Sequence, residues 1–370
     1  MIKLAEKKIV KINTKNGCKE FKSYFHFVGK VKKYRKQDES KSWVDVPYYE
    51  VKPTVTKKPR RVLQFVLETA KSNDLKIEVA GMEQTHAHPY SSKHKKSVKV
   101  VWADRLDKTK FPDDTYHIIN GTEWDRAGEI GEKIADGQWV EVKGSYEFST
   151  FMDNGTEKTV IKRTVEQFNI IENGAEINLD RTNKITYVTD FDSPDFVEVN
   201  KINIQIGIKS TYQDEKLKDT NVKAIYLANG KERSEPKDLE LTVFYQEVAE
   251  GKPLADAFAS LNRLDFIEIT GQDNNRATFS YVDIEEKLED ADPFNEVASG
   301  DKTVRQEKVT NGTKKGLEVT GYVAGTILRG FLTEQELTKS ANVKKDDPFL
   351  NQETRTESEV VGDDEDPFAE

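Results

Sequence analysis

Segments with the pattern of β-strands dominate the first half of the chain. Apolar and polar residues alternate along most of them, and aromatic and β-branched side chains are frequent, which is typical of half-buried strands. The predicted strands are 21–31, 43–51, 61–67, 75–79, 138–148 and 157–171. Pro47 makes the segment 43–51 an edge strand, because proline cannot donate to a central ladder. Asp153-Asn154-Gly155 predicts a tight hairpin between the last two strands.

One helix is predicted between these strands, over 122–135. Thr122 has the character of an N-cap, and Gly137 is a suitable stop. Three strands, a helix and a two-stranded hairpin form the element order of an OB-fold barrel. Gly29, inside the first strand, lies where a small closed barrel needs sharp curvature.

A similar order recurs at about 195–285 without close sequence identity. Its predicted strands are 196–209, 222–227, 239–245, 266–271 and 277–282, with a helix at 253–261 that has proline in its first turn. We therefore predict a mainly β protein with short helices, built on OB-like barrels, two in tandem, and ending in a disordered acidic tail. A generic small β-domain is the alternative for the second unit.

Composition shifts after about residue 285 towards charged, small and turn-forming residues. The predicted organisation is a basic OB-like domain at 1–175 with an insertion at 82–120, then a second OB-like domain at 176–285. A linker at 286–340 follows, whose apolar stretch 316–332 is expected to dock on a neighbouring domain. The tail, 341–370, has too few apolar residues to bury a core.

The charge is unevenly distributed along the chain. The net charge is −9, yet residues 1–110 contain 27 Lys and Arg against 12 Asp and Glu. Residues 111–280 contain 19 against 32, and residues 281–370 contain 11 against 22. A locally basic surface releases counterions from phosphates whatever the charge of the remaining chain. The asymmetry therefore favours a nucleic-acid partner for the first domain, although a solvated basic face would produce the same count.

Cations and aromatic residues are interleaved in this basic region. A groove that follows a single strand needs cations for the phosphates and flat rings on which unpaired bases stack. The candidate residues lie in the loops that border the ligand face of an OB-fold and in the insertion: Tyr34, Arg35, Lys36, Trp43, Tyr48, Tyr49, Lys52, Lys57, Lys58, Arg60, Arg61, Lys95, Lys96, Phe151 and Lys158. Arg60 and Arg61 are the strongest candidates, because a barrel core has no use for them. Trp102, Trp124, Trp139 and Tyr146 are assigned to packing.

Catalytic signatures are not recognisable, so a non-enzymatic binding protein without a cofactor is expected. The chain shows no Walker A loop, dinucleotide fingerprint, nucleophile elbow or zincin motif. His86, His88 and His94 cluster in the insertion, but no tetrahedral ligand set is evident and a solvated basic loop is favoured over a metal site. The single cysteine, Cys18, fits a reducing cytoplasm, and no apolar run is long enough for a membrane span.

An acidic peptide with an aromatic anchor occurs at the C-terminus. Its key residues are Asp363, Asp364, Asp366, Pro367 and Phe368, and Asp-Pro-Phe also stands at 347–349 and 292–294. Each copy offers a ring to an apolar pocket and carboxylates to a basic rim. A solubilising tail with an incidental phenylalanine is the alternative.

These features together resemble bacterial and bacteriophage single-stranded-DNA-binding proteins. The resemblance implies a coat on exposed DNA strands during replication and a tail that recruits replication proteins. In the bacterial family the phenylalanine is the last residue, whereas Ala369 and Glu370 follow Phe368 here. Phage-encoded partners in a host cytoplasm are therefore expected. Two rival functions stay open, a metal-dependent nuclease or polymerase accessory factor and a structural protein of a virion.

Overall fold

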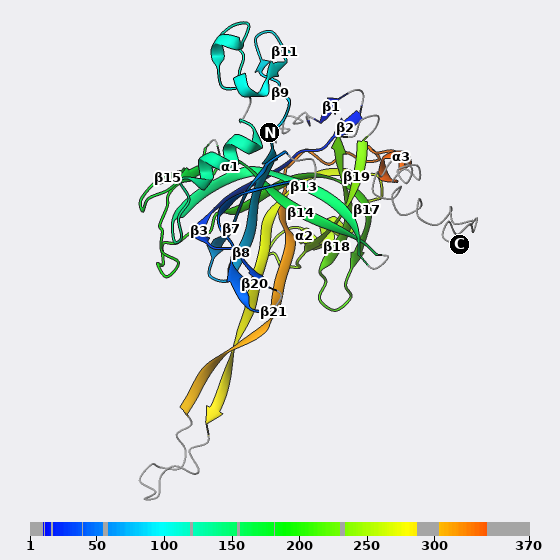
Figure 1. The fold of residues 1–370 in the computed structure, drawn as a ribbon. Helices are drawn as coiled ribbons and strands as arrows, with labels where there is room; N and C mark the ends of the chain where they lie inside the picture. Colours follow the sequence, from blue (N-terminus) through cyan, green and yellow to red (C-terminus); the bar gives the residue numbers. More distant parts are fainter. Residues whose placement is uncertain are drawn as a thin grey trace, which may run out of the picture.

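Two closed β-barrels, lying side by side, form the body of the protein (Figure 1). The computed structural model describes residues 10, 12–15, 18–38, 40–54, 58–118, 121–153, 156–180, 182–229, 234–286 and 303–338. Most of this part is strand, and its three α-helices are short. The predicted mainly β class is confirmed.

The first barrel contains five strands and one helix. They are β3 (Ser23–Lys32), β7 (Arg60–Ala70), β8 (Asn73–Met82), α1 (Glu123–Gly131), β13 (Trp139–Asp153) and β14 (Thr156–Ile170). β3 pairs with β7 and with β13, β7 pairs with β8, and β13 pairs with β14. A parallel contact of β14 with β8 closes the ring. This pairing order is that of an OB-fold, as predicted.

Local sequence explains the geometry of this barrel. A Cβ atom at Gly29 would lie 2.2 Å from the carbonyl oxygen of Glu68, so β3 can cross β7 only because this residue is glycine. The side chain of Thr122 caps α1 by accepting a hydrogen bond from the backbone N–H of Asp125, as predicted. The helix buries Ala127 and Ile130 against the core of the barrel.

The second barrel repeats this pairing order. Its elements are β17 (Asn200–Gln213), β18 (Thr220–Asn229), β19 (Ser234–Val243), α2 (Leu254–Ala259), β20 (Phe266–Glu286) and β21 (Thr303–Tyr322). β17 pairs with β18 and β20, β18 with β19, and β20 with β21. The parallel contact of β19 with β21 closes the ring. The tandem OB arrangement predicted from the sequence is therefore present.

The last two strands of this barrel differ from the prediction. The segments 266–271 and 277–282, predicted as separate strands, belong to one continuous strand, β20. Its hairpin partner β21 lies in the segment predicted as a linker, and residues 317–322 pair with 269–273 inside the barrel. The second barrel thus extends past the predicted boundary at 285. The apolar stretch 316–332 supplies part of the last strand and then packs on the same barrel, where Leu332 is buried.

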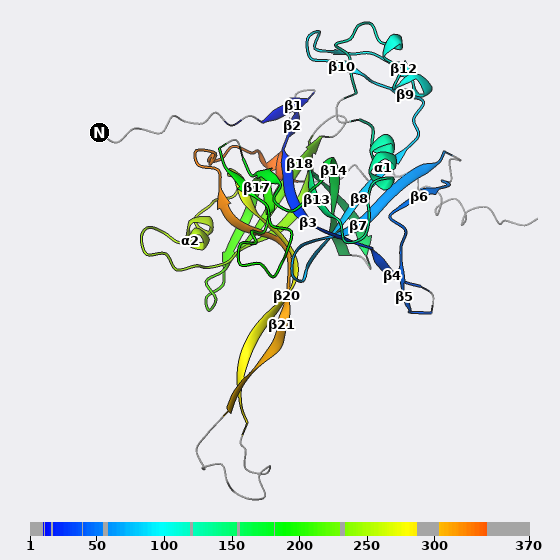
Figure 2. The ribbon, with the colours of Figure 1, turned by 90° about the vertical axis from the view of Figure 1, so that its left-hand side faces the viewer.

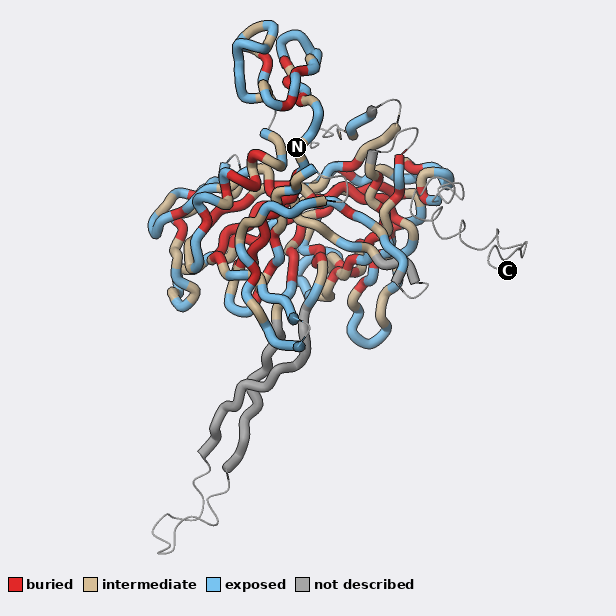
Figure 3. The backbone as a smooth tube through the Cα atoms, viewed as in Figure 1, coloured by how far each residue is buried: buried red, intermediate tan, exposed pale blue. Residues whose placement is uncertain are grey.

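The first strands of the two barrels join them into one body. Residues 23–27 of β3 pair with residues 200–204 of β17, and Arg276 of β20 pairs with Asn73 of β8. One apolar cluster includes residues of both barrels, such as Phe65 and Ile204. Buried residues, drawn in red, occur along the strands of both barrels (Figure 3).

Short elements decorate the barrels. They are β1 (Asn13–Lys15), β2 (Cys18–Glu20), β4 (Arg35–Gln37), β5 (Trp43–Asp45), β6 (Tyr49–Lys52), β9 (His86–Ala87), β10 (Tyr90–Ser91), β11 (Lys96–Ser97), β12 (Val100–Val101), β15 (Glu176–Asn178), β16 (Lys184–Thr186) and α3 (Glu334–Leu337), with 3-10 turns η1 (Trp102–Asp104) and η2 (Lys108–Lys110). The insertion that contains β9 to β12 and the far end of the β20–β21 hairpin lie at opposite ends of the molecule (Figure 2). No helix in the described part is long and apolar enough to cross a bilayer.

Candidate nucleic-acid interface

The connection between the first two barrel strands, residues 33–59, extends the sheet of the first barrel. Its strands β4 and β5 form a small ribbon, and β6 pairs with β7 as an edge strand. The backbone N–H of Val46 donates to the carbonyl oxygen of Tyr34, which ties the two sides of the excursion together. In OB-folds this loop, the hairpin of the last two strands and the face of the second and third strands form the oligonucleotide site. The corresponding elements here are the segment 33–59, the β13–β14 hairpin and the face of β7 and β8.

Two of the predicted aromatic residues are exposed on these extensions. The side chain of Trp43, on β5, is 60 % exposed, and that of Phe151, near the end of β13, is 47 % exposed. A large ring held in water on a short strand is a platform on which a base can stack. Tyr34 is partly buried, and the ammonium group of Lys76 lies 4.4 Å from the centre of its ring.

Tyr48 and Tyr49 are less available than the sequence suggested. Both are partly buried against the core of the first barrel. The hydroxyl of Tyr48 donates to Asp136 at 2.9 Å, and burial, followed by this carboxylate, raises the pKa of Tyr48 above its usual value. The ring of Tyr49 packs on α1, where a Cβ atom at Gly131 would lie 2.7 Å from its Cγ atom.

Three of the predicted cations on this face are ion-paired with neighbouring carboxylates. Arg35 contacts Asp45 at 3.2 Å, Lys52 contacts Glu50 at 2.7 Å, and Arg60 lies 3.9 Å from Glu78. All three cationic side chains are well exposed, and such surface pairs contribute only about 0–1 kcal/mol. A phosphate could therefore replace a carboxylate partner at small cost. Lys36 is also exposed, and Lys58 donates to Thr85 at 3.3 Å.

Arg61 corrects one argument made from the sequence. Its guanidinium carbon lies 4.3 Å from the centre of the Trp124 ring, and Nη1 donates to the carbonyl oxygen of Trp124 at 3.2 Å. A Cβ atom at Gly128 would lie 2.6 Å from Nη1. The barrel thus uses Arg61 to hold α1, so the premise that it has no structural role is wrong. Trp102 is buried and Trp124 packs under this cation, in agreement with their assignment to packing.

The insertion, residues 83–118, presents Lys95 and Lys96 as exposed side chains. The predicted histidine cluster does not converge, because Nε2 of His94 instead contacts Asp113 at 3.0 Å and its ring stacks on Tyr116. Partial burial, with Lys99 and His88 nearby, lowers the pKa of His86. Among the described residues, no three His, Cys, Asp or Glu side chains are placed to hold a metal ion.

Several candidates lie outside the described residues. They are Lys57 and the tail residues Asp363, Asp364, Asp366, Pro367 and Phe368. Asn154 and Gly155 of the predicted turn are also outside, although the register pairs Asp153 with Thr156. The backbone of Lys158 pairs with that of Phe151.

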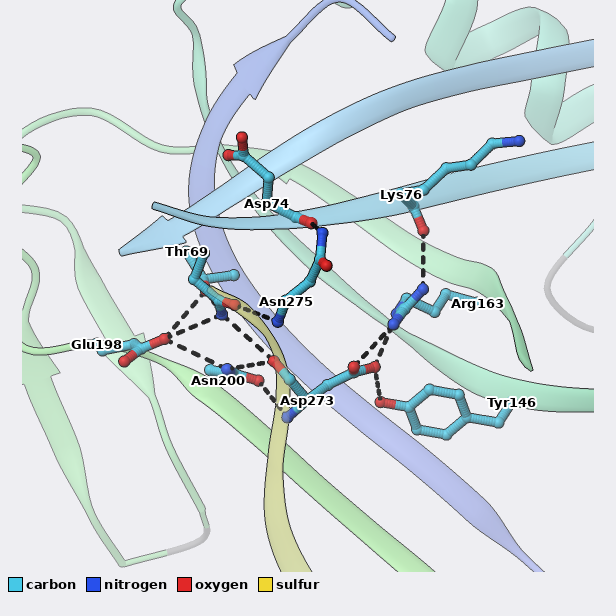
Figure 4. Close-up of polar contacts among 10 residues, drawn as sticks. Thr69, Asp74, Lys76, Tyr146, Arg163, Glu198, Asn200, Asp273 and Asn275 are labelled. Carbon is cyan, nitrogen blue, oxygen red and sulfur yellow. Dashed lines mark hydrogen bonds and ion pairs between the residues drawn. The ribbon is translucent and has the colours of Figure 1, made fainter. Parts of the chain in front are cut away.

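A buried polar network between the barrels was not predicted (Figure 4). The guanidinium of Arg163, on β14, forms two hydrogen bonds of 2.7 Å with Asp273, on β20, and the hydroxyl of Tyr146 donates to the same carboxylate at 2.9 Å. Burial and then Asp273 raise the pKa of Tyr146 well above its usual value. The side-chain amide of Asn200 donates to the backbone carbonyl of Asp273. From the sequence, only the charged residues at strand positions could have indicated this network.

The network fixes the orientation of the barrels. The Asp273 side chain is fully buried, and Glu198 joins the same region by contacting Arg276 of β20 and Thr69 of β7. Groups from both barrels thus satisfy one another away from water, where an unpaired charge would be costly.

Comparisons with solved structures find several similar chains, two of which are described here. No family model matches the sequence, and no curated protein matches it significantly. The wild-type single-stranded DNA binding protein from Thermus aquaticus aligns with 85 % of this chain and 97 % of its own, at 10 % identity and a TM-score of 0.37. A deletion mutant of the same protein aligns with 74 % of this chain and 98 % of its own, at 12 % identity and a TM-score of 0.32.

Proposed function

We propose that this protein binds single-stranded DNA, with weak sequence preference, across the outer face of the first barrel. The observation that carries the proposal is the exposed ring of Trp43 beside paired but exposed cations, on the loop that borders the ligand face of an OB-fold. The ring supplies a stacking surface, and Arg35, Lys52 and Arg60 supply charge for phosphates. The positive charge is extended along the bound DNA strand by Lys36, Lys58, Lys95 and Lys96.

The wider role follows from the same proposal. A protein that holds single strands without reading their sequence protects them while DNA is copied. We place this activity in DNA replication in a cytoplasm, that of the host if the protein is encoded by a phage. The acidic Asp-Pro-Phe tail, residues 363–368, would recruit replication partners through its carboxylates and its ring.

Binding measured at low and at high salt tests the proposal. A labelled oligo-dT strand should bind the full chain, with an affinity that falls steeply as salt rises, because phosphate contacts release counterions. Changing Arg35 and Arg60 together to Ala should weaken binding to all sequences alike and reduce the salt slope by about 1 per lost phosphate contact.

Lys223→Ala is the matched control, since Lys223 is an exposed cation on β18 of the second barrel. Affinity that is independent of salt, or tighter binding of duplex than of single strands, would contradict the proposal. Removal of residues 351–370 in a parallel titration separates the tail from the barrel: partner binding should be lost while the oligo-dT strand is still bound.

A further inference from the structure

One carboxylate lies between two cations on the outward face of β8, in the first barrel. Ile77 is buried in the core, so its neighbours Lys76 and Glu78 lie on the opposite face of the strand. The carboxylate oxygens of Glu78 are 3.5 Å from Nζ of Lys76 and 3.9 Å from Nη2 of Arg60. The two cationic side chains are 42 % and 44 % exposed. Glu78 is therefore a shared counter-ion of two cations that solvent can reach.

The connection 33–59 meets this cluster at Lys76. Nζ of Lys76 lies 4.4 Å from the centre of the Tyr34 ring, a distance at which a cation is attracted to an aromatic face. The backbone carbonyl oxygen of Lys76 accepts from Nη1 of Arg163 at 3.3 Å, whereas its ammonium group points away from Arg163 (Figure 4). Lys76, which was not among the predicted residues, is thus held at its backbone and at its side chain. It joins the loop to the face of the second and third strands, two parts of the ligand site of an OB-fold.

The second barrel has different residues at the matching positions. Its third strand, β19, buries Leu241 in the core as β8 buries Ile77. The residues on either side of Leu241 are Glu240, which is exposed, and Thr242. A carboxylate thus replaces the ammonium of Lys76, and a hydroxyl replaces the carboxylate of Glu78. The fold itself does not require two cations around one acid, and the cluster is particular to the first barrel.

We propose that Arg60 and Lys76 bind phosphate groups of the DNA strand, and that Glu78 is a built-in competitor that occupies both cations in the free protein. A carboxylate and a phosphate are alternative partners for the same cations. Exposed ion pairs are weak, so a phosphate can displace Glu78, but the displacement lowers the affinity. The inference rests on the proposed single-strand binding. It adds Lys76 to the contacts and names a residue that limits their strength.

Glu78→Gln is the informative variant, because it keeps the size of the side chain and removes its charge. We expect the full-length variant to bind an oligo-dT strand about threefold more tightly than the wild type at the same salt concentration. Glu176→Gln is the matched control, since it removes one carboxylate from an exposed pair with Lys184 outside the cluster. It causes the same change in net charge and should leave the affinity unchanged. Melting curves show whether each variant folds.

Lys76→Ala tests whether the gain arises at the cluster. Alone, it should weaken binding of all sequences alike and reduce the salt slope by about 1, because one phosphate contact is lost. Combined with Arg60→Ala, it should abolish the gain from Glu78→Gln, since neither cation is left to be released. This dependence on the partner residues is a readout that a change in folding alone would not produce.

Inorganic phosphate carries the same chemistry as a phosphate in a strand, so the two sources are compared. Melting curves of the wild type and of Glu78→Gln are measured in phosphate and in chloride at equal ionic strength. Stabilisation of Glu78→Gln by phosphate, without tighter binding of oligo-dT, would make the cluster a site for a free anion and overturn the inference.

The oligo-dT titrations separate the inference from the proposed function. An unchanged or weaker affinity in Glu78→Gln, or an equal gain in Glu176→Gln, overturns the role of Glu78 and leaves single-strand binding intact. A gain in Glu78→Gln that survives the removal of Arg60 and Lys76 also overturns it. Failure of the wild type to bind oligo-dT overturns the proposed function, and the inference with it.

Discussion

The two barrels share one strand order but extend it at different places. In the first barrel the long extension lies between the first two strands, at 33–59, whereas the matching connection of the second barrel spans only 214–219. In the second barrel the extension is the hairpin of the last two strands, where β20 has 21 residues and β13 has 15. Loops therefore differentiate two copies of the same scaffold.

Charge and exposed rings follow the same division. Basic residues outnumber acidic ones in residues 1–110, which contain the first three strands of the first barrel, and Trp43 lies on the extension between its first two strands. The second barrel lies in the region where acidic residues outnumber basic ones, and among its described residues the exposed rings, Tyr212 and Tyr322, stand on the barrel strands β17 and β21. This comparison predicts that the affinity for single-stranded DNA depends mainly on the first barrel, and that the second barrel adds a smaller contribution to that affinity.

The junction between the barrels should give the largest effect of any single substitution. Asp273→Asn leaves the buried guanidinium of Arg163 without its counter-charge, which we expect to lower the free energy of unfolding by about 3–5 kcal/mol. Chemical denaturation measures this loss, and it should also separate one cooperative transition into two. Glu176→Gln, which breaks an exposed pair with Lys184, is the control and should cost about 0–1 kcal/mol. A similar small loss in Asp273→Asn would show that the barrels are held by their strand pairing alone.

The same junction shows where the sequence was insufficient. The alternation of apolar and polar residues predicted both barrels, because period-two patterns report directly which side of a strand is buried. Residues 272–276, however, are polar and rich in Asn, which is typical of a turn, and so predicted a break between two strands. In the structure Asp273 is held by Arg163, and the backbone N–H of Asn275 donates to Asn73. Partners from the other barrel keep the strand continuous, and no local pattern contains that information.

The candidate site shows a similar limit. Composition identified the exposed Trp43 and the cations around it, because residue type and loop position suffice for that. It could not reveal that Trp124 lies under Arg61, nor that carboxylates from neighbouring strands pair with Arg35 and Arg60. Both features depend on which residues the fold brings together, over separations that periodicity does not address.

A fall in pH should affect the stability of the two barrels differently, through the corresponding residues Glu141 in the first barrel and Glu268 in the second. In the first barrel, burial would raise the pKa of Glu141, but hydrogen bonds from His26, Lys143 and Asn169 outweigh it and lower the pKa to about 2. Because the folded-state pKa lies below the unfolded value near 4.5, this carboxylate stabilises the fold at higher pH. That contribution, up to about 3 kcal/mol, is lost as the pH falls from about 5 towards 2.

Glu141→Gln should therefore flatten the dependence of the unfolding free energy on pH in that window, as measured by denaturation at a series of pH values. In the second barrel the carboxylate of Glu268 accepts from the neutral amides of Asn203 and Gln205. Glu268→Gln is the matched variant. If it flattens the acid limb as much as Glu141→Gln does, the two barrels do not differ in this respect.

The exposed rings give the smallest of the expected effects and the most direct test of the comparison. Trp43→Ala should weaken binding of an oligo-dT strand by about 1–3 kcal/mol, the contribution of one stacked base, with no change in the salt slope, because no phosphate contact is lost. Tyr212→Ala is matched in kind, since the Tyr212 side chain is 63 % exposed, yet it lies on β17 of the second barrel and should leave the affinity unchanged. Fluorescence titration of both variants, with their melting curves, separates stacking from folding. An equal loss of affinity in the two variants would mean that both barrels stack bases. A loss of affinity in Tyr212→Ala alone would mean that the DNA strand binds to the second barrel and not to the first.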